Sequence, residues 1–184
     1  EGAYEGIQRA WYEDGTKKRE AEYVNGILNG KNKNWYRNGQ IRLEGNYANG
    51  KKIGSHTAWF KNGKKFYEGN FKNDKTDGNW KEWYENGQKA REINFNNGKK
   101  DGSSLSWHEN GNIKTKTSYK NDVQIEEFFD YDTEGEPRHG KWEMVFSDTK
   151  EKITSKSKKG VRHGETKIFN QKGTLIKVTN WKKG

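Results

Sequence analysis

Residues 78–102 read GNWKEWYENGQKAREINFNNGKKDG, and this stretch contains one full copy of the pattern on which the chain is built. It holds Trp83 and two Asn-Gly pairs, at positions 86–87 and 97–98. Asn-Gly between short runs that contain aromatic residues is a strong signal for a β-hairpin turn. We therefore expect two short strands and two turns within this stretch.

The same landmarks return every 24 residues along the chain. A glycine follows each tryptophan by four positions and a second aromatic residue follows it by twelve. The tryptophan slot is filled by Trp11, Trp35, Trp59, Trp83 and Trp107. A fixed period of this length indicates a repeat architecture, in which each unit contacts only its neighbours.

The composition agrees with a thin structure rather than a two-layer globule. Only 28% of the residues are hydrophobic, whereas 14% are aromatic and 22 residues are glycine. Large rings can bury enough area to hold a single sheet together. The sequence therefore predicts an all-β fold: an elongated, single-layer antiparallel sheet of consecutive β-hairpin repeats, solenoid-like, with a 24-residue unit.

The turn after each tryptophan can be assigned from the residue opposite it. A three-residue turn that ends in a left-handed glycine places Ile41 across from Trp35, whereas a two-residue turn places a charged residue there. We expect the three-residue turn with a bulge, because its last position requires a positive φ and hence glycine. Alternation along a strand then puts Trp83 on the same face as Ile93 and Phe95. The expected aromatic seam consists of Trp11, Trp35, Trp59, Trp83, Trp107 and Phe169.

The regular pattern stops after residue 121 and resumes in a different phase. Residues 1–121 hold five regular repeats, and residues 140–184 hold two more, with Gly164, Phe169 and Trp181 in template positions. Counting back 24 residues from Phe169 places Val145 in a tryptophan slot. Val145 lies 38 residues after Trp107, so this interval holds 14 residues more than one unit. We expect them in an irregular interruption at 122–139, as an insertion or as a distorted repeat.

Charge follows the same division. Residues 122–136 contain seven acidic residues and no lysine or arginine, whereas residues 150–184 contain eleven basic and two acidic residues. The basic surface therefore belongs to the last repeats, which suggests an anionic contact there. The chain has no cysteine for a disulfide or a thiolate zinc site. No apolar run reaches the length of about 18 residues that a membrane-spanning helix needs.

Catalytic and cofactor sites find little support in the sequence. Glu13, Glu85 and Glu109 recur at one turn position, which fits hairpin structure better than a unique acid–base pair. His139 and His163 fill a slot that is polar and variable in the other units, as in a solvated turn. The glycines are not followed by a helix, so they do not form a phosphate loop. We expect no enzymatic activity, no cofactor and no bound metal.

Three short motifs carry a family resemblance: LEGNY at 43–47, EGNFKN at 68–73 and WYENG at 83–87. They resemble the bacterial variant of the MORN (membrane occupation and recognition nexus) repeat, in particular the type known as YwqK-like antitoxins. The resemblance covers residues 6–121 and 140–184, and the departures are the interruption, Val145, Thr149 and Ser157. It implies a binding scaffold for proteins, for self-association or for phospholipids. The antitoxin type implies neutralisation of a partner toxin.

Two segments are candidate binding sites. The interruption leaves the template without an evident folding reason, and its candidate contact residues are Glu126, Glu127, Phe128, Phe129, Asp130 and Tyr131. The basic end is the candidate for an anionic surface, through Lys156, Lys158, Lys159 and Arg162. Nucleic acid is a poor fit, because recognition would need a groove-entering element or more arginines than this cluster has.

The sequence thus predicts a non-enzymatic repeat scaffold that binds another protein, with toxin neutralisation as its specific form. A cell-surface or anionic-lipid-binding module is the alternative, and a glycan-binding or cell-wall-binding module that uses the tryptophans is the third hypothesis. The chain begins at Glu1 rather than methionine, which favours a secreted or lipoprotein-like protein over a cytoplasmic one. The identity of the partner and the oligomeric state stay open at this point.

Overall fold

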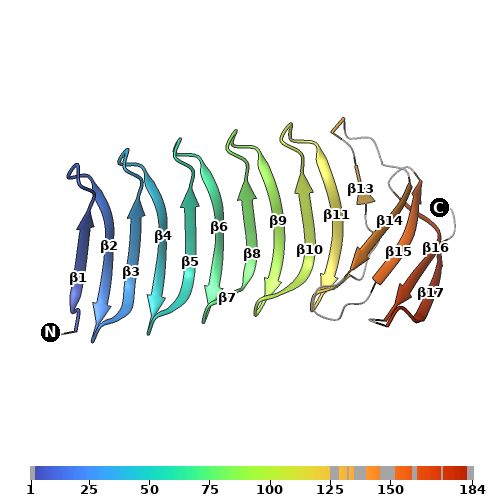
Figure 1. The fold of residues 1–184 in the computed structure, drawn as a ribbon, viewed down its shortest axis with the longest axis horizontal. Coiled ribbons are helices and arrows are strands. Elements are labelled where there is room, and N and C mark those ends of the chain that lie inside the picture. Colours follow the sequence, from blue (N-terminus) through green and yellow to red (C-terminus); the bar gives the residue numbers. More distant parts are fainter. Residues whose placement is uncertain are drawn as a thin grey trace.

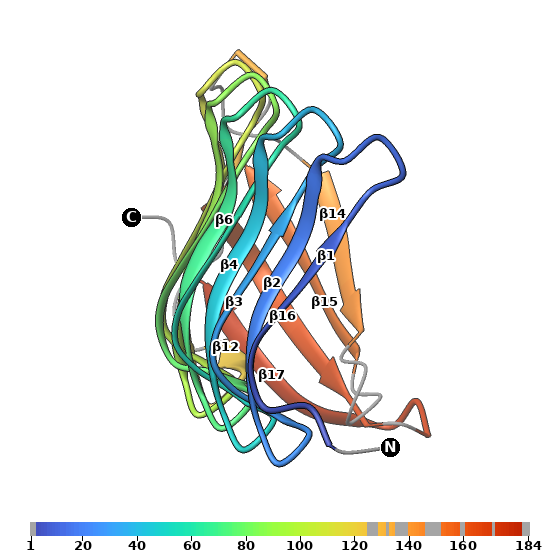
Figure 2. The ribbon, with the colours of Figure 1, turned by 90° about the vertical axis from the view of Figure 1, so that its left-hand side faces the viewer.

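The computed structural model describes residues 3–124, 129–131, 133–134, 140–145, 152–158, 161–170 and 172–181. Within these ranges the elements are all strands, and they form a row of hairpins along the long axis of the molecule (Figure 1). The strands curve in the same sense, so the row forms a trough when it is viewed from its N-terminal end (Figure 2). This confirms the predicted single-layer array of consecutive antiparallel hairpins.

The long sheet contains 13 of the described strands, which follow one another in chain order, with β7 paired to β6 and β13 paired to β11. Its strands are β1 (Gly6–Trp11), β2 (Lys17–Val24), β3 (Ile27–Trp35), β4 (Ile41–Ala48), β5 (Lys51–Trp59), β6 (Lys65–Lys72), β7 (Lys75–Thr76), β8 (Gly78–Trp83), β9 (Lys89–Asn96), β10 (Lys99–Trp107), β11 (Ile113–Lys120), β12 (Val123–Gln124) and β13 (Phe129–Asp130).

A second antiparallel sheet lies at the C-terminal end of the row (Figure 1). Its four strands pair in chain order, and β13 of the long sheet approaches β16. The strands are β14 (Gly140–Val145), β15 (Lys152–Lys158), β16 (Val161–Phe169) and β17 (Leu175–Trp181).

The turn after each tryptophan has the predicted three-residue form. Trp35 pairs with Ile41, and the N–H of Tyr36 donates to the carbonyl of Gln40 at 2.8 Å. The carbonyl of Tyr36 accepts from the N–H of Gly39 at 3.0 Å, and Gly39 has a φ of +81°. Glycine fills this slot because other residues rarely adopt that conformation. We call these the tip turns.

The second turn of each unit has two residues with positive φ. Asn49 and Gly50 have φ values of +49° and +76°, as a type I′ hairpin turn requires. Asp74 and Asp122 replace glycine in two units and keep φ values of +66° and +67°. Their carboxylates accept hydrogen bonds from the N–H groups of Lys52 and Lys100 at 2.8 Å, which holds them in this conformation.

The prediction that Trp83 shares a face with Ile93 and Phe95 is wrong. Trp83 pairs with Lys89, but the residue before Trp83 pairs with Arg91, so two residues of β9 oppose one of β8. Such a bulge shifts the alternation of side chains by one position. The tryptophans of the tip turns therefore lie on one face, and the second aromatic residue of each unit lies on the other.

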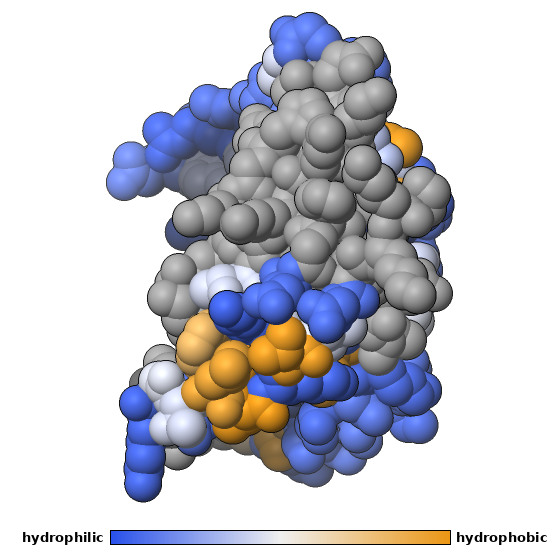
Figure 3. Space-filling model, turned by 90° about the vertical axis from the view of Figure 1, so that its right-hand side faces the viewer, coloured by the Kyte–Doolittle hydropathy of each residue, from blue (hydrophilic) through white to orange (hydrophobic). Residues whose placement is uncertain are grey.

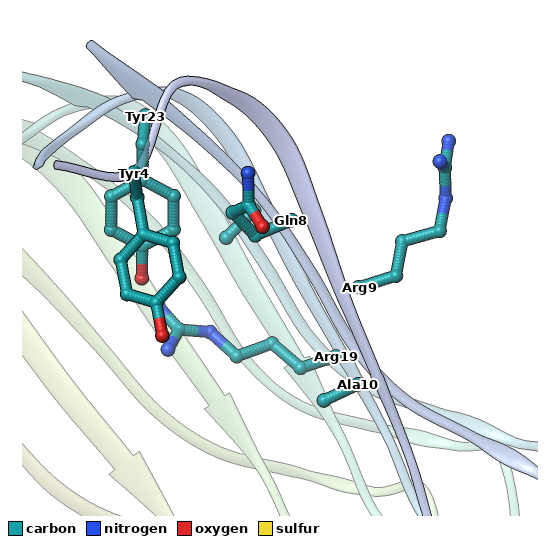
Figure 4. A pocket seen from close by; sticks show the side chains of 7 residues that line it. Tyr4, Gln8, Arg9, Ala10, Arg19 and Tyr23 are labelled. Carbon is teal, nitrogen blue, oxygen red and sulfur yellow. The ribbon is translucent and has the colours of Figure 1, made fainter. Parts of the chain in front are cut away.

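The curvature distinguishes these two faces. Figure 4 shows Tyr4, Tyr23, Gln8 and Arg19 within the curve of the strands at the first hairpin, whereas Arg9 extends away on the other side. We call the side within the curve the concave face and the opposite side the convex face. At the centres of successive strands, paired residues form one row across the concave face. The row consists of Ala21, Asn32, Gly45, His56, Gly69, Trp80, Ile93, Ser104 and Thr117.

Side-chain size alternates along this concave row. His56 is 1% exposed and lies between Gly45 and Gly69, which belong to the neighbouring strands. A Cβ atom on Gly45 would lie 2.1 Å from Nδ1 of His56, and one on Gly69 would lie 2.3 Å from Cε3 of Trp80. Glycine is therefore required at these two positions by the close approach of a ring rather than by a turn.

Candidate binding surfaces

The floor of the concave face is aromatic. The ring that follows the tip-turn tryptophan by twelve positions is half-buried in each unit, at Tyr23, Tyr47, Phe71, Phe95 and Tyr119. Between them, the ring of His56 contacts Tyr47 and Phe71 edge to face, with centroid distances of 5.3 and 4.8 Å. Trp80 stacks on Tyr67 at 4.7 Å. The concave face is thus an aromatic trough with one ring in each regular unit, and its rings contact one another from Tyr47 to Trp80.

Cations border the concave rings. The guanidinium of Arg19 lies 5.8 Å from the Tyr23 centroid, and Lys52 Nζ lies 4.9 Å from that of Phe71. Such contacts are favourable because the ring face carries negative charge density. At the first unit, Tyr4, Tyr23 and Arg19 line a hollow of about 200 Å³ (Figure 4). This combination of rings and cations suits an anionic or aromatic surface of a partner.

The convex face carries a ladder of alternating charges. Cross-strand pairing places in one row the residues Arg9, Glu20, Lys33, Glu44, Thr57, Glu68, Lys81, Glu92, Leu105 and Lys116. Arg9 binds Glu20 at 2.8 Å, and Lys33 binds Glu44 at 3.0 Å. Opposite charges on facing positions stabilise a sheet modestly. The row is close to neutral, and Thr57 and Leu105 interrupt it.

The tip-turn tryptophans also lie on the convex face, each beside a slot that holds lysine in most units. Lys65 Nζ lies 5.5 Å from the ring centroid of Trp83 and 2.5 Å from Glu68. The hydrogen bond from Lys65 is the main reason that the pKa of the Glu68 carboxyl lies below its usual value. Lys17 and Lys89 cover Trp35 and Trp107 in the same way, at 5.0 Å.

Tip turns of successive units are joined by hydrogen bonds between residues 23 positions apart. The hydroxyl of Tyr84 donates to the carbonyl of Trp107 at 2.7 Å, and Tyr12 and Tyr36 make the same bond. The amide of Asn86 donates to the carbonyl of Glu109 at 2.8 Å. These bonds were not predicted from the sequence, although Tyr and Asn recur at the fixed spacing that they require. Each unit is thereby fastened to the next at its tip.

The repeat unit seen in the structure also matches a known protein family. A family model for the MORN repeat variant matches residues 4–25, 28–49, 52–73, 76–97 and 100–121, and each match begins 24 residues after the last. Together the matches cover more than half of the chain. The chain belongs to the MORN repeat variant family. MORN repeats are non-catalytic modules for contact with proteins or membrane lipids. Among curated proteins, none matches this chain.

The MORN array places one residue of the acidic interruption clearly. The N–H of Tyr131 donates to the carbonyl of Lys114 at 2.8 Å, and its carbonyl contacts Nε2 of His108 at 2.9 Å. The second contact repeats the 23-residue bond of the tip turns, so Tyr131 occupies the slot that tryptophan fills in the regular units. Phe129 and Asp130 pair through their backbones with Lys116 and Thr115 of β11. The other predicted contact residues here, Glu126, Glu127 and Phe128, lie outside the described residues.

The predicted basic site is placed by its backbone. Lys156 pairs with His163, Lys158 with Val161, and Arg162 with Ser157, so the three basic residues lie on the adjacent strands β15 and β16. Lys159 lies outside the described residues. Because β16 is also the strand that β13 approaches, the structure brings the two candidate segments toward one end of the MORN array.

The remaining predicted site residues are those of the aromatic seam. Trp35, Trp59, Trp83 and Trp107 are half-buried, and Trp11 on the outermost described strand is 55% exposed. Phe169 holds the same slot in the second sheet, where it pairs with Leu175. Among the described residues, no three His, Asp or Glu side chains come together as metal ligands. No helix long and apolar enough to cross a membrane is found in the described parts of the chain.

Proposed function

We propose that this MORN array is a scaffold that binds a partner protein on its concave face. The observation that carries the proposal is the aromatic trough, which has one half-buried ring in each of five successive units and cations beside three of those rings. Half-buried rings and arginine are the groups most enriched at the energetic centres of protein interfaces. The family's use in protein contacts supports the same conclusion.

In the proposal the interruption adds a second contact beyond the concave face. Tyr131 occupies a tip-turn slot, which lies on the convex side in the regular units, and the sequence of segment 122–136 supplies seven acidic residues. A partner that contacts both would need a basic patch beside an acidic or aromatic one. In its most specific form, the partner is a toxin of a bacterial host, and binding blocks the toxin's active surface.

A matched pair of double variants tests the concave face. Replacing Lys52 and Lys100 by glutamine removes two cations from the concave rings, and replacing Lys33 and Lys81 by glutamine removes two from the convex ladder. The tagged proteins are incubated with extract of the source cells, and co-purifying proteins are quantified and then confirmed with the purified partner. We expect the first pair alone to weaken capture. Equal capture by both pairs, or loss only with the convex pair, would refute the concave site.

The toxin form has its own test. The product of the gene next to this one is expressed in a heterologous host, with and without the array, and growth is recorded. Neutralisation predicts that growth arrest is relieved by the native array and not by the concave variant. A neighbouring gene product without toxicity would remove the toxin form and leave the scaffold intact.

Anionic lipid is the second candidate, and one observation favours it. Figure 3 shows apolar surface among hydrophilic residues at the C-terminal end of the molecule. In β17, the last described strand, Ile176 and Val178 are 52% and 43% exposed. Apolar side chains beside a lysine-rich segment suit insertion at an anionic membrane surface. Sedimentation with phosphatidylserine vesicles tests this, with a double serine variant of the two residues as the comparison. Absence of binding at low salt would exclude the lipid function.

A further inference from the structure

One of the tip-turn tryptophans on the convex face, Trp59, differs from the others in its surroundings. The slot that covers the ring holds Lys17, Lys65 or Lys89 for the neighbouring rings, but it holds Ile41 for Trp59. The position two residues before the ring is Lys33 for Trp35 and Lys81 for Trp83, but it is Thr57 for Trp59. Trp59 therefore lacks the lysine that lies over the ring in those units and the lysine two residues before it, but Lys65 of β6 pairs with it from the other side; its ring is half-buried.

The small side chain of Thr57 leaves space on both sides of the ladder. A hollow of about 470 Å³ is lined by Lys31, Glu44, Asn46, Ser55, Thr57, Trp59 and Lys65. A second hollow of about 260 Å³ continues from Ser55 and Thr57 toward Asn79. The two hollows share Ser55 and Thr57, so they form one open groove across the convex face. We call it the Thr57 groove.

One polar atom in this groove is unsatisfied. The amide nitrogen of Asn79 donates to Glu92 at 3.2 Å and to Asn94 at 3.1 Å, which fixes the amide. Its oxygen Oδ1 is buried and has no hydrogen-bond partner among the described residues. Buried acceptors without a partner are uncommon in folded proteins and often mark the place of an absent ligand or water.

Most of the charges that border the groove are already paired within the array. Glu44 binds Lys33 at 3.0 Å, and Glu68 binds both Lys65 and Lys81, at 2.5 and 3.4 Å. The groove therefore offers hydroxyls, amides and one aromatic ring, and of its charged lining residues only Lys31 has no ion pair among the described residues. Its shape is shallow and open, which is poorly suited to an apolar small molecule.

We propose that the Thr57 groove binds a short chain of neutral pyranose sugars. A sugar ring presents a flat C–H face, which stacks on an exposed indole, and a rim of hydroxyls, which pair with amides and with serine and threonine. From β4 to β8 the groove crosses three strand spacings, roughly 14 Å, which is the length of about three sugar rings. Such a site lies on the face opposite the trough, so it does not compete with the proposed protein contact for the same surface.

The neighbouring units supply the test variant. Thr57→Lys introduces the residue that the same slot holds at 33 and 81, and it sits between the carboxylates of Glu44 and Glu68, so the fold is retained. The lysine fills the groove and places a cation near Trp59. Leu105→Lys makes the same change two units further along and serves as the matched control.

Titration calorimetry measures the binding of cellohexaose, chitohexaose and maltohexaose to the whole chain. We expect one of the three to bind, with an affinity in the micromolar to millimolar range. Thr57→Lys should weaken that binding by about tenfold or more, whereas Leu105→Lys should leave it unchanged. Urea unfolding of both variants checks that neither has lost stability.

Two results would overturn the proposal. One is the absence of binding heat with all three hexasaccharides at millimolar concentration. The other is equal binding by the native chain and Thr57→Lys. A polyglutamate peptide is titrated in parallel at low and high salt. If it binds in a salt-dependent manner and the sugars do not, the groove is a contact for an acidic protein segment instead.

Discussion

Replacing Gly45 by alanine should destabilise the array, because its added methyl group would overlap a buried ring. The methyl would lie 2.1 Å from Nδ1 and 2.3 Å from Cε1 of His56, well inside contact distance. The ring has no free direction of movement: it contacts Tyr47 and Phe71 on its flanks, and Nε2 is 2.9 Å from the carbonyl of Asn46. The variant must therefore displace the ring, the strand or both.

The size of the effect can be estimated from its parts. Overpacking of a close-packed site costs about 1–3 kcal/mol. Losing the hydrogen bond from His56 to the carbonyl of Asn46 adds about 1 kcal/mol. Alanine in place of glycine restricts the unfolded chain, which returns about 0.5–1 kcal/mol. We expect Gly45→Ala to lower the free energy of unfolding by about 1–3.5 kcal/mol, mostly in the units that contain β4 and β5.

The assay combines urea unfolding, followed by circular dichroism, with hydrogen exchange, because repeat arrays need not unfold as one unit. The array itself provides the rescue: Ala21 lies beside Asn32 in the preceding unit, so alanine and asparagine are compatible neighbours. The double variant Gly45→Ala with His56→Asn should therefore be more stable than Gly45→Ala alone. If the alanine costs the same with His56 and with asparagine, ring overlap is not the cause and the reasoning fails.

The remaining predictions concern pH and the tip turns. Burial lowers the pKa of His56, so the unfolded chain binds a proton more readily than the folded one; stability should fall as pH drops below about 6.5, and His56→Asn should flatten this slope in urea titrations between neutral and mildly acidic pH. Phe60 occupies the slot of the bonding tyrosines, so Phe60→Tyr should stabilise the array by about 0.5–1.5 kcal/mol by reaching the carbonyl of Trp83, and an unchanged urea midpoint would contradict this. Asn86→Asp should cost about 1 kcal/mol in the same assay, because a carboxylate cannot donate to the carbonyl of Glu109; no loss of stability would show that this bond contributes nothing.

The sequence was sufficient for the fold because its signals are local. An Asn-Gly pair specifies its turn through its own φ angles, and the spacing between Trp35 and Gly39 fixes the three-residue tip turn. The prediction that Trp83 shares a face with Ile93 was wrong because the bulge opposite Trp83 is not a local signal. It arises only when β8 pairs with β9. Alternation counted along one strand could not include it.

The size match between Gly45 and His56 was not found from the sequence either. The two residues are 11 positions apart and face each other only after the strands pair. In the sequence, Gly45 looks like one more glycine among the turn residues. Gly45 is not among the residues with a positive φ, so the close approach of the His56 ring, and not a turn, is what requires glycine there. Positions that compensate across strands become visible only when whole units are aligned and compared column by column.

Strand β5 carries the departures from the repeat on both of its faces, and the two are connected. At Asn46 the pairing of β4 and β5 is interrupted by a bulge, which would leave the carbonyl of Asn46 without its ladder partner. The ring of His56 fills this gap from the concave side, because Nε2 donates to that carbonyl. The side chain of Asn46 lines the Thr57 groove on the convex side. A shallow binding site gains affinity from a rigid base. The buried histidine holds the backbone at Asn46, beside the polar side chains that line the groove. The concave packing of His56 therefore supports the convex site at Thr57, through the one strand that they share.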